Sequence, residues 1–314
     1  NLAHLRCVTH FSTCKRLINL FSHLALFLHF NYLVPEFFLM VTVIQCADKV
    51  GLVAAIAGVF AKENINIISM REHVDAANNR FFMRVVAEEY TKADMLQSAL
   101  EQVLPPGAEI KVNPLPEKKA IILVTKEYHC LSDILIRNHF KTLGAKVQCV
   151  IGNHPTLQNI CERFNVPFQL VSHENKSREI FETELLQTIR TFETDYLVLA
   201  KFMRILSSEF IDRFPVRIVN IHHSFLPAFV GANPYRKAFD RGVKLIGATA
   251  HFVTNELDEG PIIAQQIIPV DHSFTAAGMM KAGKEIETAV LAKALQLVFD
   301  DRVFVHNNKT VVFD

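Results

Sequence analysis

Amide, imidazole and carboxylate side chains gather in two short polar segments of this sequence. The first lies at the end of the apolar run 217–221 and contains Asn220 and His222, and the second, over 251–260, contains Asp258. An amide can stabilise a developing oxyanion, while an imidazole or a carboxylate can move a proton. Together these three side-chain types suit the hydrolysis or transfer of a carbonyl group.

Each segment also has a plainer interpretation. A histidine at the end of a strand is more often structural than catalytic, and the segment 251–260 is also typical of a solvated acidic turn between two strands. Asn220 and His222 are two residues apart, so on an extended strand both side chains project to the same side. This spacing favours a shared crevice, although neither segment is specific alone.

The elements that must position these residues alternate in type. Short runs that are apolar on both faces predict strands, at 120–124, 147–151, 196–200 and 217–221. Helical stretches are predicted between them, at 134–143, 156–164 and 180–192, and a long amphipathic helix at 275–299. This alternation is typical of a doubly wound α/β domain with a mostly parallel sheet, which binds ligands at the carboxyl ends of its strands.

A different pattern precedes this region. Strands are predicted at 38–45, 64–74, 81–87 and 109–112, and helices at 52–61 and 92–103. Their order, βαββαβ, is that of a ferredoxin-like module. We therefore expect one domain over 37–114, a linker over 115–119 and a second domain over 120–314. No acidic side chain precedes Glu36, and residues 1–36 are expected to be a non-native or targeting-like extension outside the fold.

The composition excludes several classes of protein. The 314 residues carry a formal net charge of +1, which argues against nucleic-acid partners and against membrane binding. Six scattered cysteines form no C-x-x-C pair, so a zinc ribbon and a disulfide scaffold are not expected. Scattered thiols of this kind indicate a reducing compartment, and we expect a cytoplasmic protein.

Longer strings carry a resemblance to a known family. The strings NIHHSFLP over 220–227 and LDEGP over 257–261, with the segments 199–207, 231–232 and 242–249, resemble the folate-dependent formyltransferase fold. The overall pattern is most similar to the formyltetrahydrofolate deformylases. In that family an ACT domain, an amino-acid-sensing module, comes first, and the string CADKVGL over 46–52 looks like part of it. The resemblance covers about residues 38–314.

The resemblance implies hydrolysis of 10-formyltetrahydrofolate to tetrahydrofolate and formate, which supplies formate to purine biosynthesis and balances one-carbon folate pools. Asn220 would hold the formyl oxygen, and His222 would act with Asp258 in proton transfer around the attacking water. The folate pocket and its water side would be formed by Met203, Arg204, Ile205, Leu206, His129, Gly231 and Val253. No cofactor and no metal are implied, because the folate is the substrate.

For the ACT domain, the resemblance implies an amino-acid effector near Asp48, Gly51 and Asn66, and a homo-oligomer, either dimer or tetramer. Three positions depart from the family's usual residues: Ala47 replaces a proline, Tyr128 an aspartate and Ala264 a glutamate.

Two alternatives remain. The first is formyl transfer to an amine such as glycinamide ribonucleotide, which would need a glycine-rich phosphate loop after the first strand of the second domain. The segment 126–132 has no glycine and carries Glu127, which favours water over a phosphorylated acceptor. The second is a folate- or amino-acid-binding regulator without chemistry, which would not need Asn220, His222 and Asp258 together.

Overall fold

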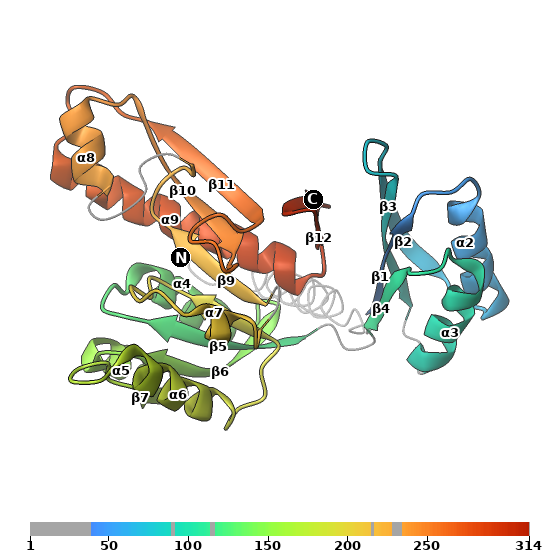
Figure 1. The fold of residues 1–314 in the computed structure, drawn as a ribbon, viewed down its shortest axis with the longest axis horizontal. Helices are drawn as coiled ribbons and strands as arrows, with labels where there is room; N and C mark the ends of the chain where they lie inside the picture. Colours follow the sequence, from blue (N-terminus) through green and yellow to red (C-terminus); the bar gives the residue numbers. More distant parts are fainter. Residues whose placement is uncertain (1–38, 89–91, 114–116, 215–216, 228–233, 314) are drawn as a thin grey trace, which may run out of the picture.

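The computed structural model describes residues 39–88, 92–113, 117–214, 217–227 and 234–313. The expected extension over 1–36, residues 114–116 of the linker region and Gly231 lie outside these ranges. Within them the chain forms a four-stranded, a seven-stranded and a two-stranded sheet. Figure 1 shows the first two sheets as separate groups of elements.

The four-stranded sheet has the predicted ferredoxin-like topology, with strand order β2-β3-β1-β4. Its elements are β1 (Leu39–Ala47), α2 (Leu52–Lys62), β2 (Ile67–Asp75), β3 (Arg80–Glu88), α3 (Ala93–Val103) and β4 (Glu109–Asn113). Helix α2 buries Leu52, Ile56 and Val59 on one face, as their helical spacing predicts. The sequence placed the start of β2 three residues too early.

The seven-stranded sheet has the order β11-β10-β9-β8-β5-β6-β7. Its strands are β5 (Lys118–Val124), β6 (Ala145–Gly152), β7 (Phe168–Leu170), β8 (Tyr196–Leu199), β9 (Ile218–His222), β10 (Leu245–Phe252) and β11 (Ile262–Pro269). The neighbouring strands β9-β8-β5-β6-β7 are parallel to one another, whereas β10 is antiparallel to both β9 and β11. The predicted mostly parallel sheet is confirmed. Strand β5 begins two residues earlier than expected, inside the segment assigned to the linker.

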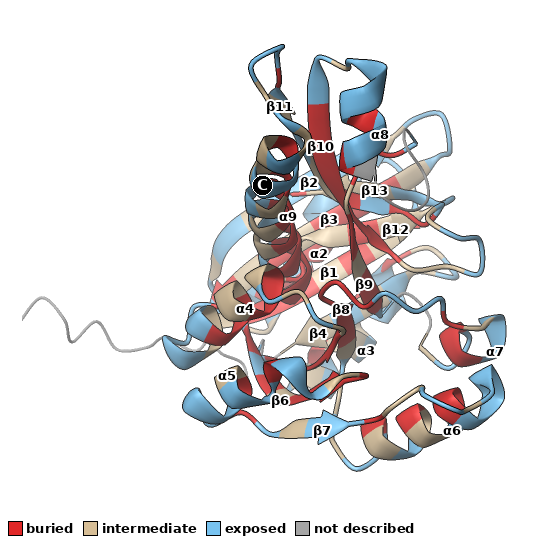
Figure 2. Ribbon diagram, turned by 90° about the vertical axis from the view of Figure 1, so that its left-hand side faces the viewer, coloured by how far each residue is buried: buried red, intermediate tan, exposed pale blue. Residues whose placement is uncertain are grey.

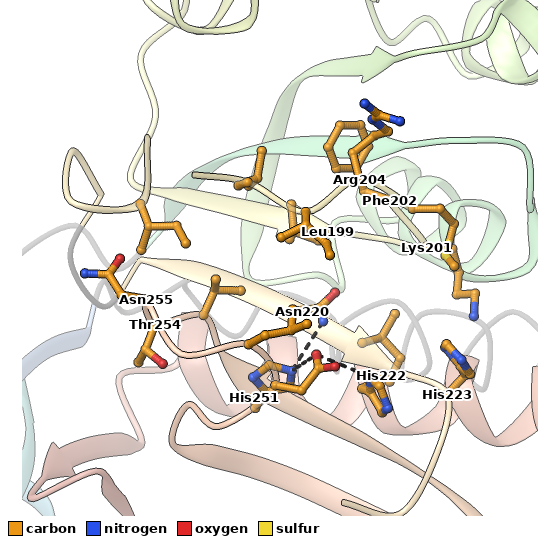
Figure 3. A pocket seen from close by; sticks show the side chains of 18 residues that line it. Leu199, Lys201, Phe202, Arg204, Asn220, His222, His223, His251, Thr254 and Asn255 are labelled. Atoms are coloured by element: carbon orange, nitrogen blue, oxygen red, sulfur yellow. Dashed lines mark hydrogen bonds and ion pairs between the residues drawn. The ribbon is translucent and has the colours of Figure 1, made fainter. Parts of the chain in front are cut away.

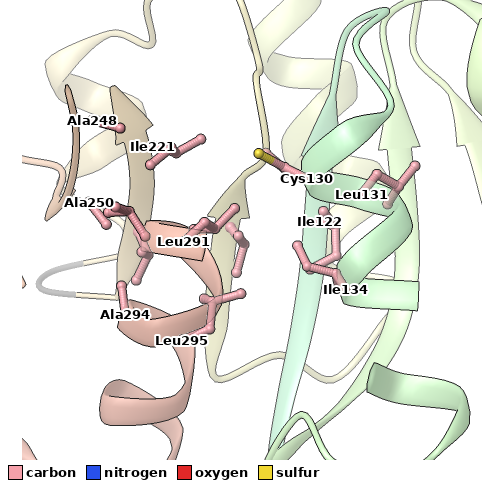
Figure 4. Close-up of a cluster of buried hydrophobic side chains, with 14 of the residues drawn as sticks. Ile122, Cys130, Leu131, Ile134, Ile221, Ala248, Ala250, Leu291, Ala294 and Leu295 are labelled. Carbon is pink, nitrogen blue, oxygen red and sulfur yellow. The ribbon is translucent and has the colours of Figure 1, made fainter. Parts of the chain in front are cut away.

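Helices cover both faces of this sheet, which confirms the doubly wound fold (Figure 2). One face packs against α4 (His129–His139), α5 (Gln158–Arg163) and α9 (Ala276–Phe299), and the other against α6 (Arg178–Ile189) and α7 (Ser208–Ile211). Figure 4 shows Ile221 of β9 and Ala250 of β10 facing Leu291 of α9. A 3₁₀ turn, η1 (Pro155–Leu157), precedes α5, and α8 (Pro234–Arg241) precedes β10.

A short hairpin follows α9 and was not predicted from the sequence. Strands β12 (Val303–His306) and β13 (Lys309–Val312) are joined by Asn307 and Asn308, whose φ angles are 48° and 57°. In Figure 1, β12 lies between the four-stranded sheet and the seven-stranded one. Phe304 and Phe313, both at the open end of the hairpin, pack with the fully buried Phe82 of β3.

In the part of the chain that the structure describes, no helix has the length and apolar character needed to cross a membrane. The cysteines within it, Cys46, Cys130, Cys149 and Cys161, are buried and unbonded to one another.

Candidate active site

A cavity of about 340 Å³ opens at the carboxyl ends of β8 and β9. The loop after β8, the end of β9, His251 of β10 and the segment 253–258 form its walls (Figure 3). Eight of the residues singled out from the sequence line it: Met203, Arg204, Ile205, Leu206, Asn220, His222, Val253 and Asp258. The two polar segments that contain Asn220, His222 and Asp258 therefore meet at one site, as the sequence predicts.

Asn220 is held by a histidine of the neighbouring strand. Its Nδ2 lies 3.3 Å from Nε2 of His251, which stands directly opposite Asn220 in the β9–β10 register. Burial lowers the pKa of His251, and its Nδ1 lies 2.8 Å from the carbonyl oxygen of Phe252. A carbonyl can only accept, so Nδ1 carries the proton and Nε2 accepts from the amide. The second N–H of the Asn220 amide stays available to a ligand oxygen.

His222 and Asp258 form the second pair. Nδ1 of His222 lies 3.3 Å from Oδ1 of Asp258, and the imidazole side chain is only 6% exposed. The hydrogen bond from His222 lowers the pKa of the Asp258 carboxyl, so the carboxylate form is favoured. Nε2 of His222 is buried and has no hydrogen-bond partner among the described residues. That nitrogen can therefore accept or deliver a proton while Nδ1–H stays on Asp258.

Asp258 reaches this position on the turn between β10 and β11. Its φ of 59° lies in the left-handed region, which aspartate tolerates better than most residues. Two residues on, a Cβ at Gly260 would stand 1.8 Å from the carbonyl oxygen of Phe252, so only glycine fits. The string LDEGP is thus also a structural requirement, and the interpretation as a turn between strands holds together with the functional one.

The loop after β8 is fixed through its backbone. The Met203 N–H donates to Oγ1 of Thr125 at 2.9 Å, and Nη2 of Arg178 donates to the carbonyl oxygen of Ile205 at 3.1 Å. With the backbone fixed in this way, the side chains of Met203 and Ile205 remain 57% and 64% exposed at the cavity mouth. Large apolar side chains left open at a cavity are typical of a surface that a ligand covers.

His129 does not line the cavity. It begins α4, and its Nε2 donates to Oε2 of Glu287 at 2.8 Å. Nζ of Lys201, a cavity residue, lies 3.1 Å from the same carboxylate oxygen, and the Tyr235 hydroxyl donates to Oε1 at 2.7 Å. The structure therefore places His129 in a buried network behind the cavity wall, not beside the expected attacking water.

Glu287 is ionised at the centre of this network. Burial alone would raise its pKa, but the hydrogen bond from His129, the charge of Lys201 and the Tyr235 hydroxyl together lower it to about 2. His129, Cys130 and Glu287 place ligand-type atoms within 4.8 Å of one another. Burial raises the pKa of the Cys130 thiol, and Lys201 already neutralises Glu287. The chemistry of the group suits an internal ion pair better than a cation site.

Replacing Glu287 with glutamine is expected to reduce the free energy of unfolding by about 3 kcal/mol, because the Lys201 ammonium is then buried without a counter-charge. The lowered pKa of Glu287 means that its contribution is complete above about pH 4.5 and is lost as the pH falls toward 2. Urea unfolding at pH 7 measures the change. The exposed Glu285→Gln on the same helix is the control, and equal midpoints for the two variants would contradict the prediction.

The residues expected to bind an effector do not meet within one chain. Asp48 and Gly51 lie at the start of α2, where the Asp48 N–H donates to the Asn79 carbonyl just before β3. Asn66 bonds Glu88 at the opposite end of β3. Tyr128, one of the three departures from the family's usual residues, stands before α4 and is 61% exposed.

Sequence reasoning missed two residues of the site. His251 lies within the polar segment 251–260, but its contact with Asn220 depends on the register of β9 and β10. The last residue of β9 and the first residue of β10 are 23 positions apart in the sequence. Lys201 follows β8 with a φ of 63°, and only its buried partner Glu287 explains its place in the wall.

Comparison with known protein families gives a match for each of the two domains. The formyl transferase family matches residues 118–295, and the ACT domain family matches residues 40–102. The seven-stranded domain is therefore of the formyl transferase class, preceded by an ACT domain.

The individual relatives share one name. The formyltetrahydrofolate deformylase of Escherichia coli (strain K12) is 48% identical over 267 residues, which are 85% of this chain and 95% of the relative. The crystal structure of the formyltetrahydrofolate deformylase from Pseudomonas syringae covers 95% of this chain and all of its own, with 36% identity and a TM-score of 0.86. The chain belongs to the formyltetrahydrofolate deformylase family.

A more distant likeness covers a smaller part of the chain. Glycinamide ribonucleotide transformylase 1 from Symbiobacterium toebii is 28% identical, with a TM-score of 0.61, and the match covers 64% of this chain and 96% of that protein.

Proposed function

We propose that this chain is a hydrolase that converts 10-formyltetrahydrofolate to tetrahydrofolate and formate. The observation that carries the proposal is the convergence of Asn220, His222 and Asp258 on one apolar cavity. The family of the chain gives the substrate, and the three side chains supply the chemistry that formamide hydrolysis requires. The reaction needs no cofactor, because the folate is consumed as substrate.

In the proposed mechanism, the formyl oxygen accepts the free N–H of the Asn220 amide. Water attacks the formyl carbon and gives a proton to Nε2 of His222, whose Nδ1–H remains on the Asp258 carboxylate. The carbon–nitrogen bond then breaks, His222 returns the proton to the departing folate nitrogen, and formate leaves. Asn220 stabilises the oxyanion, which is worth about 10²–10³ in rate at comparable sites.

The apolar walls of the cavity suit the flat ring system of a reduced folate. Phe202, Leu206 and Val253 line them, and the exposed Met203 and Ile205 stand where they would cover the ring edge. Arg204 is exposed on the same loop, so its charge is available to the polar part of a bound folate.

The geometry after β5 supports water over a phosphorylated amine as the acceptor. Glu127 presents a carboxylate there, and Nζ of Lys284 lies 2.6 Å from it. The pair neutralises the charge of Lys284, and the segment between β5 and α4 offers no glycine for close approach of backbone N–H groups.

The test is an assay of the purified protein with 10-formyltetrahydrofolate and no added amine. We expect formate and tetrahydrofolate to appear together in equal amounts. Turnover that requires glycinamide ribonucleotide would instead establish a transferase, and the absence of turnover in both assays would favour the binding regulator.

The proposal extends to the rest of the chain. Residues 37–114 would form the regulatory ACT domain, 115–119 the linker and 120–314 the catalytic domain, with an amino-acid effector near Asp48 and Gly51. The open edge of β2, which pairs with β3 on one side only within the described chain, supports a homo-oligomer, a dimer or tetramer. The buried free cysteines support a cytoplasmic location. Light scattering that gives the mass of one chain would contradict the oligomer.

A further inference from the structure

The turn that carries Asp258 has little packing of its own. Residues 255–257 and Glu259 are exposed, and Asp258 itself is held by the two histidines that it serves. A loop with few buried apolar contacts opens easily unless contacts from outside hold it. The position of the carboxylate therefore depends on what anchors the turn on each side.

Two hydrogen bonds from other parts of the chain flank Asp258. On its amino-terminal side, Nδ2 of Asn255 donates to Oδ1 of Asp212 at 3.0 Å. On its carboxyl-terminal side, Nδ2 of Asn308 donates to the carbonyl oxygen of Glu259 at 2.9 Å. The second anchor acts on the residue next to Asp258, and it comes from the turn of the β12–β13 hairpin.

The hairpin is well placed to act as a rigid support. Oγ1 of Thr310 donates to the carbonyl oxygen of Ile262, so the hairpin holds the chain after Asp258 at two points. Its other contacts reach the ACT domain: the rings of Phe304 and Phe82 meet edge to face at 5.6 Å, and Phe313 completes the cluster. The hairpin thus spans from the ACT sheet to the turn that carries the carboxylate.

We infer that the β12–β13 hairpin is a strut that sets the position of the Asp258 carboxylate against His222, and that Asn308 is a positioning residue for the reaction. The inference rests on the proposed function, because it assumes that Asp258 acts with His222. Asn308 touches neither the cavity nor the reacting atoms, and it acts through the backbone of Glu259.

The turn geometry offers a clean variant. Asn308 has a φ of 57°, which glycine adopts without strain, so Asn308→Gly removes the side-chain hydrogen bond and keeps the hairpin. Asn307→Gly is the matched control, since its φ of 48° also suits glycine and its amide bonds Asn78, not the Asp258 turn. Asn308→Asp keeps the shape of the side chain but replaces the amide donor with a group that repels the carbonyl oxygen.

Steady-state hydrolysis of 10-formyltetrahydrofolate by the full chain is the test. We expect Asn308→Gly and Asn308→Asp to lower kcat about five- to tenfold with little change in KM, since small misplacement of a reacting group is costly while the folate walls are untouched. Asn307→Gly should keep the parent's kcat, because the cluster of Phe82, Phe304 and Phe313 still holds the hairpin against the ACT sheet when the bond to Asn78 is lost. A structural role alone would lower the melting temperature and leave kcat unchanged.

The contribution of the ACT sheet can be tested in the same assay. Phe82→Leu loosens the strut at its far end, so its effect on kcat should be less than additive with that of Asn308→Gly. Additive losses, or an unchanged kcat in Asn308→Gly, would overturn the inference. Asp258→Asn is measured in parallel. If Asp258→Asn loses activity and Asn308→Gly does not, the inference about the hairpin is contradicted and the proposed function stands. If Asp258→Asn stays active, the proposed role of Asp258 itself is contradicted.

Discussion

Asp258→Asn is expected to lower kcat for formate release by about 10³-fold while the protein stays folded. The carboxylate accepts Nδ1–H of His222 at 3.3 Å, and in the proposed mechanism it stabilises the positive charge that the imidazole gains when it takes a proton. Asparagine has almost the same size but cannot supply that charge. Stopped assays of formate and tetrahydrofolate measure the loss.

The pH dependence of the parent gives a second readout. The hydrogen bond from His222 keeps the pKa of Asp258 below its ordinary value of 3.8, so the carboxylate persists at and above that pH and is lost only on stronger acidification.

Glu256→Gln removes an exposed carboxylate from the same turn and should keep kcat within about threefold of the parent. Equal losses in the two variants would mean that the charge of the turn matters, not the pair with His222.

Asn220→Ala is expected to lower kcat about 10²–10³-fold, with a smaller change in KM, because the hydrogen bond from the amide to the formyl oxygen strengthens as negative charge develops there. The variant also leaves Nε2 of the buried His251 without its donor. The same coupled assay measures the effect.

Asn220→Asp separates the chemical role from a spacing role. Aspartate fills the same volume, but its carboxylate repels a developing oxyanion, so its kcat should be as low as that of Asn220→Ala. Recovery to within about threefold of the parent would contradict oxyanion stabilisation and assign Asn220 a packing role.

The sequence was informative wherever the signal is local. The βαββαβ order, the apolar runs of β5, β6 and β8, and the two-residue spacing of Asn220 and His222 each follow from periodicity within a few residues. The position of Asp258 next to His222 was available only through resemblance, because the turn between β10 and β11 approaches β9 through an antiparallel pairing that no local pattern specifies.

The buried network behind the cavity was beyond such reasoning. Glu287 lies on the buried, apolar face of α9. A single carboxylate on such a face departs from the helical pattern, but the pattern does not indicate what that carboxylate binds. Its partners Lys201 and His129 come from 86 and 158 positions away, so their charges could not be matched in advance. For this reason His129 was expected at the water side of the folate pocket.

The hairpin could have been found. The run 303–312 carries β-branched and aromatic residues, at 303–305 and 310–312, on both sides of Asn307 and Asn308. Asparagine is a side-chain type that tolerates the left-handed region a two-residue turn requires. Its strands are four residues long, which is short enough to be overlooked after a long helix.

The pairing of β9 with β10 has a consequence for how such proteins diversify. Asn220, His222 and His251 lie on adjoining strands, so none can move without breaking the main-chain ladder of the sheet. Glu127, by contrast, lies in the loop between β5 and α4, outside both the strand and the helix. If the proposed function holds, the residues of β9 and β10 that activate the formyl group are therefore constrained to stay together. The residues between β5 and α4 that select the attacking molecule can be substituted one at a time. Descendants of such a chain can exchange one acceptor for another through intermediates that all still fold.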